Sequence, residues 1–260
     1  METKKVVEYI VNWLKSYAEG AGTKGFVVGV SGGIDSAVTS ALCARTGLNL
    51  LCLEMPIHQS KDQVSRARKH IEELKAHFPN ASSHEVELTN VFDAFIGQLP
   101  PHENTSAHEF SLVNARARLR MTTLYYFAGL HGYLVAGTGN KVEDFGVGFY
   151  TKYGDGGVDL SPIADLMKTE VYKVGEELGV LDEILTAPPT DGLWGDSRTD
   201  EDQIGATYPE LEWAMEFSGN EERLSEREKK VLAIYRDLNA RNQHKMEPIP
   251  VCEIPESLKE

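Results

Sequence analysis

This sequence has fewer basic residues than acidic ones. Lys and Arg number 26 against 40 Asp and Glu, which gives a formal net charge of -14. Because a nucleic-acid backbone is normally bound by a basic face, this balance argues against a nucleic-acid partner. No apolar run approaches the roughly 20 residues of a membrane-spanning helix, and residues 3–19 have the pattern of an amphipathic helix, not a signal peptide. We therefore predict a soluble, cytoplasmic protein that binds small molecules.

Cysteine is also scarce. Cys43, Cys52 and Cys252 show no spacing typical of a disulfide framework or a metal site. Cys43 and Cys52 stand in apolar segments, where a small buried side chain is the expected role. The odd number and the missing pairing pattern fit a reducing compartment.

Strand-like and helical patterns alternate along most of the chain. Apolar strand patterns occupy residues 25–30, 48–57, 84–88 and 133–138, and helical patterns occupy 3–19, 35–46, 60–78, 111–132 and 168–178, followed by terminal helices. Such alternation is typical of βαβ units. We therefore predict one α/β domain over residues 1–260, with a doubly wound, Rossmann-like parallel sheet and helices on both faces. Ligands bind at the carboxyl ends of such strands, which directs attention to the loops after Val30, Met55 and Gly137.

The segment "SGGIDS", Ser31 to Ser36, lies between a predicted strand and a predicted helix. Its glycines leave backbone N–H groups accessible, and the positive end of the helix dipole adds to an anion site. The alternative is a tight turn in which the glycines only allow close packing. The lysine of a Walker loop, which reaches the transferred phosphates, is absent, and so is the dinucleotide pattern G-x-G-x-x-G. The loop therefore suits a pyrophosphate leaving group, with Asp35 available for a divalent metal.

Two motifs together carry a resemblance to a known family. "SGGIDSA" resembles the pyrophosphate loop of the N-type ATP pyrophosphatases, which adenylate a carbonyl oxygen. The stretch 137–180, with "TKYGDGGVD" and an acidic residue five positions after Thr138, resembles the NAD synthetases, and the match extends from about residue 5 to residue 247. The resemblance implies a ligase that amidates deamido-NAD with ammonia and ATP through an acyl-adenylate, releasing NAD⁺, AMP and pyrophosphate. It also implies a homodimer.

The resemblance implies three roles at the ATP end of the site. Mg²⁺ would be held by Asp35 and Glu143, and Lys168 would stabilise charge on the departing pyrophosphate. Asp35, Lys168 and Asp159 are the implied catalytic residues, Asp159 being a candidate base for ammonia. The implied ATP contacts are Gly29, Val30, Ser31, Gly32, Gly33, Ile34, Asp35, Ser36, Met55, Ser60, Thr138, Lys168 and Thr190.

A second set of residues is implied for deamido-NAD. These residues are Arg118, Lys152, Asp159, His244 and Lys245. Arginine and lysine suit the pyrophosphate and carboxylate of that substrate. Arg116 or Arg120 is the alternative to Arg118 in the same helix. Many relatives have an arginine for the adenosine where this chain has Glu54-Met55-Pro56, and Asn140 and Lys141 are left without a role.

Several alternatives remain open on these residues. The chain reaches its loop by residue 31, so no glutaminase domain is expected and free ammonia is the predicted donor. Residues 90–108, predicted to be a mobile excursion, and 186–204 are expected to order over the ligands and exclude water.

Rival functions are another adenylating enzyme of this superfamily, similar to GMP synthetase or to tRNA-modifying enzymes, and a non-catalytic nucleotide-binding relative.

Overall fold

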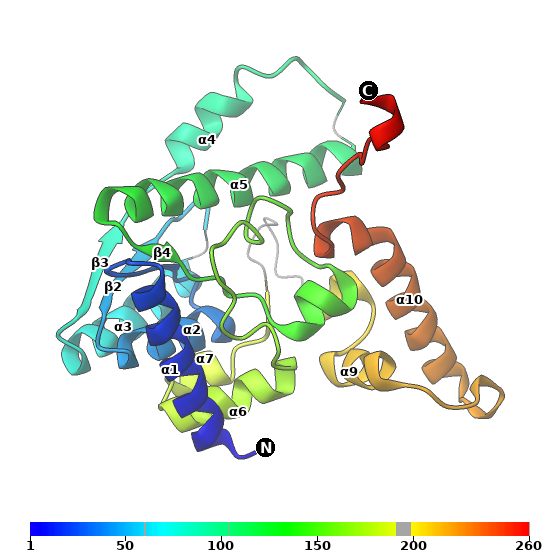
Figure 1. Cartoon of the computed structure of the whole chain (residues 1–260), viewed down its shortest axis with the longest axis horizontal. Helices are drawn as coiled ribbons and strands as arrows, with labels where there is room; N and C mark the ends of the chain where they lie inside the picture. The colour runs from blue at the N-terminus through cyan, green and yellow to red at the C-terminus, as the bar shows by residue number, and fades with distance from the viewer. Residues whose placement is uncertain (60, 104, 191–198, 260) are drawn as a thin grey trace.

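Four parallel strands form the sheet on which the rest of the chain is arranged (Figure 1). The computed structural model describes residues 1–59, 61–103, 105–190 and 199–259. The sheet order is β3-β2-β1-β4, with β1 at Gly25–Gly29, β2 at Asn49–Glu54, β3 at Ala81–Glu85 and β4 at Leu134–Val135. β1 pairs in parallel with both β2 and β4. The predicted α/β class with a parallel sheet is thereby confirmed.

Helices cover both faces of this sheet. In Figure 1, α5 (Ser106–His131) crosses one face, while α1 (Thr3–Gly20), α2 (Ile34–Arg45) and α6 (Lys168–Leu178) lie on the other. The remaining helices are α3 (Lys61–His77), α4 (Thr89–Ile96), α7 (Asp182–Leu185), α8 (Asp200–Ile204), α9 (Tyr208–Glu216) and α10 (Glu226–Met246). None of the helices described is long and apolar enough to cross a membrane.

The alternation of side chains along β1 explains the two layers. Phe26 and Val28 belong to the apolar core on the side of α1, α2 and α6, whereas Val27 belongs to the core beneath α5. All three side chains are fully buried. A strand that is buried on both faces needs an uninterrupted apolar sequence, which is what "FVVGV" provides.

The sequence-based prediction misplaced one strand and missed one helix. The third strand lies at Ala81–Glu85, not at 84–88, because its register with β2 pairs Leu50 with Ala81 and Glu54 with Glu85. This edge strand is largely polar, so a prediction based on apolar residues placed the strand too late in the chain. The stretch 90–108, predicted to be a mobile excursion, contains most of α4, whose Phe92 is buried, and the start of α5, where Thr105 caps the helix by accepting from the His108 amide at 3.3 Å.

The C-terminal helices build a third apolar core beside the sheet. It joins α9 and α10 to a short π-helix at Val142–Val147, with Leu211 and Val142 fully buried. Asn239 and Asn242 of α10 donate to the backbone carbonyls of Gly146 and Val147, each at 2.8 Å. This layer therefore fixes the π-helix against the edge of the sheet where the strands end.

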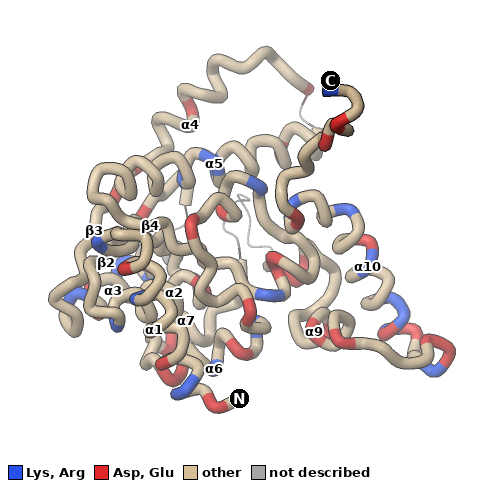
Figure 2. The backbone as a smooth tube through the Cα atoms, viewed as in Figure 1, with Lys and Arg blue, Asp and Glu red and all other residues tan. Residues whose placement is uncertain are grey.

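Charged side chains are spread over all these layers. In the view of Figure 2, Lys and Arg are scattered among the more numerous Asp and Glu over several helices, not gathered in one stripe. A protein that follows a nucleic-acid backbone normally carries such a basic stripe.

Candidate nucleotide-binding site

A cavity of about 270 Å³ opens at the carboxyl ends of β1, β2 and β4. The three loops expected there, after Val30, Met55 and Gly137, all line it. The cavity is lined by every predicted ATP contact that the structure describes: Gly29, Val30, Ser31, Gly32, Gly33, Ile34, Asp35, Ser36, Met55, Thr138, Lys168 and Thr190. Ser60, the remaining predicted contact, lies outside the described residues.

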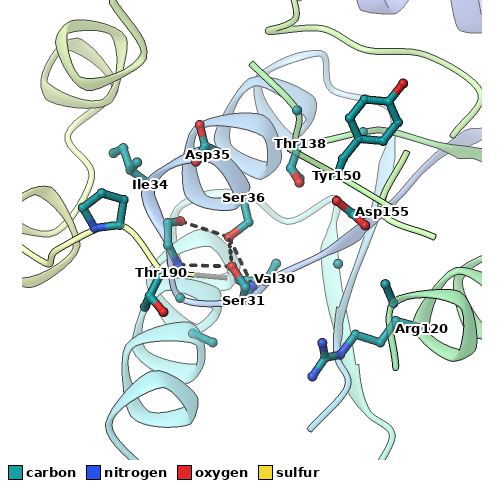
Figure 3. Close-up of a pocket in the computed structure, with 18 of the residues that line it drawn as sticks. Val30, Ser31, Ile34, Asp35, Ser36, Arg120, Thr138, Tyr150, Asp155 and Thr190 are labelled. Atoms are coloured by element: carbon teal, nitrogen blue, oxygen red, sulfur yellow. Dashed lines mark hydrogen bonds between the residues drawn. The ribbon is translucent and has the colours of Figure 1, made fainter. Parts of the chain in front are cut away.

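Hydrogen bonds within the loop after β1 hold it in shape (Figure 3). The Ser36 hydroxyl accepts from the Ser31 amide at 3.2 Å and donates to the Gly33 carbonyl at 3.0 Å. Gly32 adopts a φ of 83°, a left-handed conformation that favours glycine. The loop leads directly into α2, whose first amides have no partner within the helix. This arrangement is typical of a phosphate-binding helix N-terminus.

Three charged side chains from separate elements converge beside the loop. Lys168, the first residue of α6, places its Nζ 2.5 Å from Asp35 Oδ2 and 2.9 Å from Glu143 Oε1. The lysine side chain is only 3 % exposed, and the two carboxylates are 18 % and 16 % exposed. Asp35 belongs to α2 and Glu143 to the π-helix, so the cluster lies where the core of α1, α2 and α6 meets the C-terminal core.

Asn140, which had no role from the sequence, links the Asp35 carboxylate to the backbone of Glu143. Its Nδ2 donates to Asp35 Oδ1 at 3.0 Å, while its Oδ1 accepts from the Glu143 amide at 3.1 Å. Tyr208 of α9 donates from its hydroxyl to Glu143 Oε1 at 2.5 Å. Lys141 has no such role, since its Nζ pairs with the exposed Asp165 at 2.9 Å.

The charges of Lys168 and Glu143 stabilise each other, whereas at Asp35 burial outweighs the Lys168 charge and raises the pKa of the carboxyl. Burial alone would lower the pKa of Lys168, yet Asp35 and Glu143 outweigh it and raise that pKa above its ordinary value. Burial likewise opposes ionisation of Glu143, but the Lys168 charge and the Tyr208 hydrogen bond leave its pKa lowered. Lys168 is therefore a permanent cation at physiological pH and cannot act as a base.

Two further acids line the cavity and were not identified from the sequence. Burial, followed by the charge of Glu143, raises the pKa of Asp144 to about 8. Burial also raises the pKa of Asp155 to about 6, although its side chain faces the open cavity, where water screens part of that effect. A Cβ at Gly139 would lie 2.1 Å from Asp144 Oδ2, so only glycine allows this carboxylate its place.

Two arginines also line the cavity without having been assigned to ATP. The Arg120 Nε donates to the Met55 carbonyl at 3.0 Å, and its Nη2 donates to Gln59 Oε1 at 2.7 Å. Arg120, labelled in Figure 3, thus contacts Met55 of the loop in which the family resemblance implies an arginine for the adenosine. The Arg66 Nε donates to the Gly32 carbonyl at 3.3 Å. Arg120 was the sequence-based alternative to Arg118 for the other substrate, whereas no local sequence signal marks Arg66, which comes from a helix outside the loop that it contacts.

The five residues predicted for deamido-NAD lie outside the lining of this cavity. Arg118 donates to the Lys152 carbonyl at 3.3 Å, and the Lys152 Nζ donates to the His244 carbonyl. The Lys245 Nζ donates to the carbonyls of Gly148 and Tyr150 at 2.8 and 2.9 Å. Asp159 accepts from the Tyr125 hydroxyl at 3.0 Å and the Val135 amide at 2.8 Å. Their role in binding this substrate stays a prediction.

Comparison with known proteins gives consistent matches over almost the whole chain. A family model described as NAD synthase matches residues 6–249. An NH₃-dependent NAD⁺ synthetase of Finegoldia magna is 41 % identical over 213 residues, which cover 82 % of this chain and 84 % of that protein. The solved structure of an NMN synthetase from Francisella tularensis covers 98 % of this chain and all of its own, with a TM-score of 0.86 and 31 % identity. An NH₃-dependent NAD synthetase from Campylobacter jejuni covers 97 % of this chain and all of its own, with a TM-score of 0.76 and 28 % identity.

Proposed function

Because this chain belongs to the NAD synthase family, we propose that its cavity amidates deamido-NAD with ammonia and ATP, yielding NAD⁺, AMP and pyrophosphate. The reaction is the final step of NAD biosynthesis. The observation that carries the proposal is the cluster of Asp35, Lys168 and Glu143 beside the phosphate-binding loop. A carboxylate is a poor electrophile, so it must be adenylated before ammonia attacks. The cluster and the loop together suit the departure of pyrophosphate in that step.

The residues of this cluster have separable roles in the proposal. Asp35 and Glu143 converge on one cation, as a divalent metal site requires, and Mg²⁺ typically takes one or two protein carboxylates together with phosphate oxygens and water. These residues therefore fit Mg²⁺, which when bound supplies positive charge against the triphosphate. Lys168 stabilises negative charge on the leaving pyrophosphate, and the first amides of α2 hydrogen-bond its oxygens.

The test is a product assay on the purified protein. With ATP, Mg²⁺, NH₄Cl and deamido-NAD, NAD⁺ and AMP should form in equal amounts. Asp35→Ala should abolish turnover without loss of the fold, while Asp165→Ala, an exposed acid paired only with Lys141, should behave as the wild type. A wild-type protein that forms no NAD⁺ contradicts the proposal, and it would direct attention to another adenylating activity or to nucleotide binding without catalysis.

A second candidate substrate is nicotinic acid mononucleotide, the acid from which NMN is formed by the same amidation. The structural match at a TM-score of 0.86 is to a protein named for NMN synthesis. The ratio of kcat/KM for the two substrates, measured side by side, decides between them.

We also propose that the protein works in the cytoplasm as a homodimer, which the family resemblance supports. Apolar side chains are available for a second copy on α5 and the C-terminal segment. Tyr126 is 65 % exposed, Leu130 62 % and Ile249 68 %. Light scattering after size-exclusion chromatography should give twice the mass of one chain, and a monomer at all concentrations contradicts this part of the proposal.

A further inference from the structure

We propose that Arg66 of α3 binds the pyrophosphate portion of ATP and holds it as the leaving group over Gly32 and Gly33. This inference rests on the proposed use of ATP by the cavity. In a Walker loop, a lysine within the loop supplies the cation for the phosphates. Here an arginine from a separate helix would supply it.

The first support is the position of the guanidinium. Arg66 is half-buried, lines the cavity with Ser31, Gly32 and Gly33, and donates from Nε to the Gly32 carbonyl at 3.3 Å. Over the described part of the chain, this is the one hydrogen bond of its guanidinium, and no carboxylate pairs with it. The two terminal Nη groups therefore remain for a ligand bound at the loop.

The second support is the balance of charge around the cavity. Lys168 is already paired with two carboxylates, Asp35 and Glu143, before any nucleotide binds. Asp144 and Asp155 add acidic groups to the same cavity. A polyphosphate brings several more negative charges, which favours a cation not already neutralised by protein carboxylates. Arg66 is such a cation within the described residues, and its planar fork suits two phosphate oxygens at once.

The third support is the way in which α3 is fixed against α2. His70 follows Arg66 by four residues and therefore shares its helix face. Its imidazole is 4 % exposed, and its Nε2 lies 2.9 Å from the Ser40 hydroxyl, which donates to the Ser36 carbonyl at 2.7 Å. This buried link ties the Arg66 face of α3 to the helix that begins in the phosphate-binding loop. Arg68, by contrast, is exposed and pairs with Glu85 at 2.7 Å.

Three variants separate a phosphate contact from a structural role. Arg66→Gln can still donate to the Gly32 carbonyl but has no charge, Arg66→Lys keeps the charge without the fork, and Arg68→Gln is the matched control on the same helix. Calorimetric titration should measure the affinity of each variant for Mg²⁺-pyrophosphate and for AMP, and urea unfolding should verify the fold.

We expect Arg66→Gln to weaken pyrophosphate binding by about 10- to 100-fold, the range of a lost hydrogen bond to a charged group. AMP affinity should be unchanged, Arg66→Lys should be intermediate, and Arg68→Gln should match the wild type. Equal pyrophosphate affinity in Arg66→Gln and Arg68→Gln overturns the inference, and so does an equal loss for pyrophosphate and AMP. If the wild type binds neither pyrophosphate nor AMP, the proposed function itself fails, which is a separate and recognisable result.

Discussion

The two groups of predicted site residues are built in different ways. The inner cluster, Asp35, Glu143 and Lys168, consists of largely buried side chains from different elements, and both carboxylates lie within 2.9 Å of the Lys168 Nζ. In the outer set, Arg118, Lys152, Asp159, His244 and Lys245, the cations donate mainly to backbone carbonyls, and none lines the cavity. The difference teaches that the packed core fixes the inner cluster, whereas the outer set is held mainly by backbone contacts outside the cavity lining, where a large ligand or a second chain can still reorganise it.

The largest expected effect comes from removing the cation of the inner cluster. Lys168→Met leaves two buried carboxylates without their partner, which should lower the free energy of unfolding by about 3 to 5 kcal/mol. Urea denaturation without Mg²⁺ at pH 7.5 measures this change. Lys152→Met in the outer set and Lys141→Met, whose partner Asp165 is 98 % exposed, should change stability little. Equal stability of all three variants would contradict the contrast between the two groups.

The next-largest expected effect is a loss of stability at low pH, caused by the buried His70. Burial lowers the pKa of His70 to about 4 from an ordinary value of 6.5. As the pH falls through this interval, the unfolded state binds a proton that the folded state does not, so about 3 kcal/mol of unfolding free energy should be lost. His70→Gln should remove most of that loss in urea titrations at pH 7 and pH 4.5. The control His77→Gln, on the exposed side of the same helix, should retain it, and an unaltered pH dependence in His70→Gln would refute the assignment.

A smaller effect of opposite sign is expected from Asp144. Its folded pKa of about 8 lies above the ordinary 3.8, so the folded state keeps a proton that the unfolded state releases between these values. Stability should therefore fall as the pH rises from about 4 to 8. Asp144→Asn should be more stable than the wild type at pH 8 by about 2 kcal/mol, after allowance for screening by water in the cavity, and nearly equal at pH 4. The same pH slope in both proteins would show that Asp144 is not protonated in the fold.

The smallest effect concerns the outer set. Arg118→Gln should raise KM for deamido-NAD by about 10-fold through the loss of one charge-assisted contact, while KM for ATP and the unfolding free energy stay near wild type. Steady-state kinetics with each substrate varied in turn measures both constants. Arg241→Gln, an exposed arginine paired with Asp237 within α10, is the control. A change in KM for ATP alone would place Arg118 with the inner cluster and remove the distinction.

The parts of the site that could be predicted from sequence are those that local patterns encode. "SGGIDS" between a strand and a helix has the character of a phosphate-binding loop, and the loops after β1, β2 and β4 do line one cavity. The strand at Ala81–Glu85 was misjudged because a polar edge strand gives a weak apolar pattern. The helix at Thr89–Ile96 was missed although Val91, Phe92 and Phe95 fall at helical spacing, because the polar residues that follow it dominate the stretch 90–108. Asn140 could not have been assigned, since it joins Asp35 across 105 positions of sequence.

By itself, the sequence determined the layered α/β class, the family and the chemical character of the phosphate-binding loop. These depend on short-range periodicity and on motifs whose residues are close together in the chain. The tertiary structure alone decided which charges meet: that Lys168 is shared by Asp35 and Glu143, that Arg120 and Arg66 reach the cavity from α5 and α3, and that Asp144 and Asp155 face it. The physical reason is that pKa values and ion pairs depend on distance and burial, and both arise only when separate layers pack together.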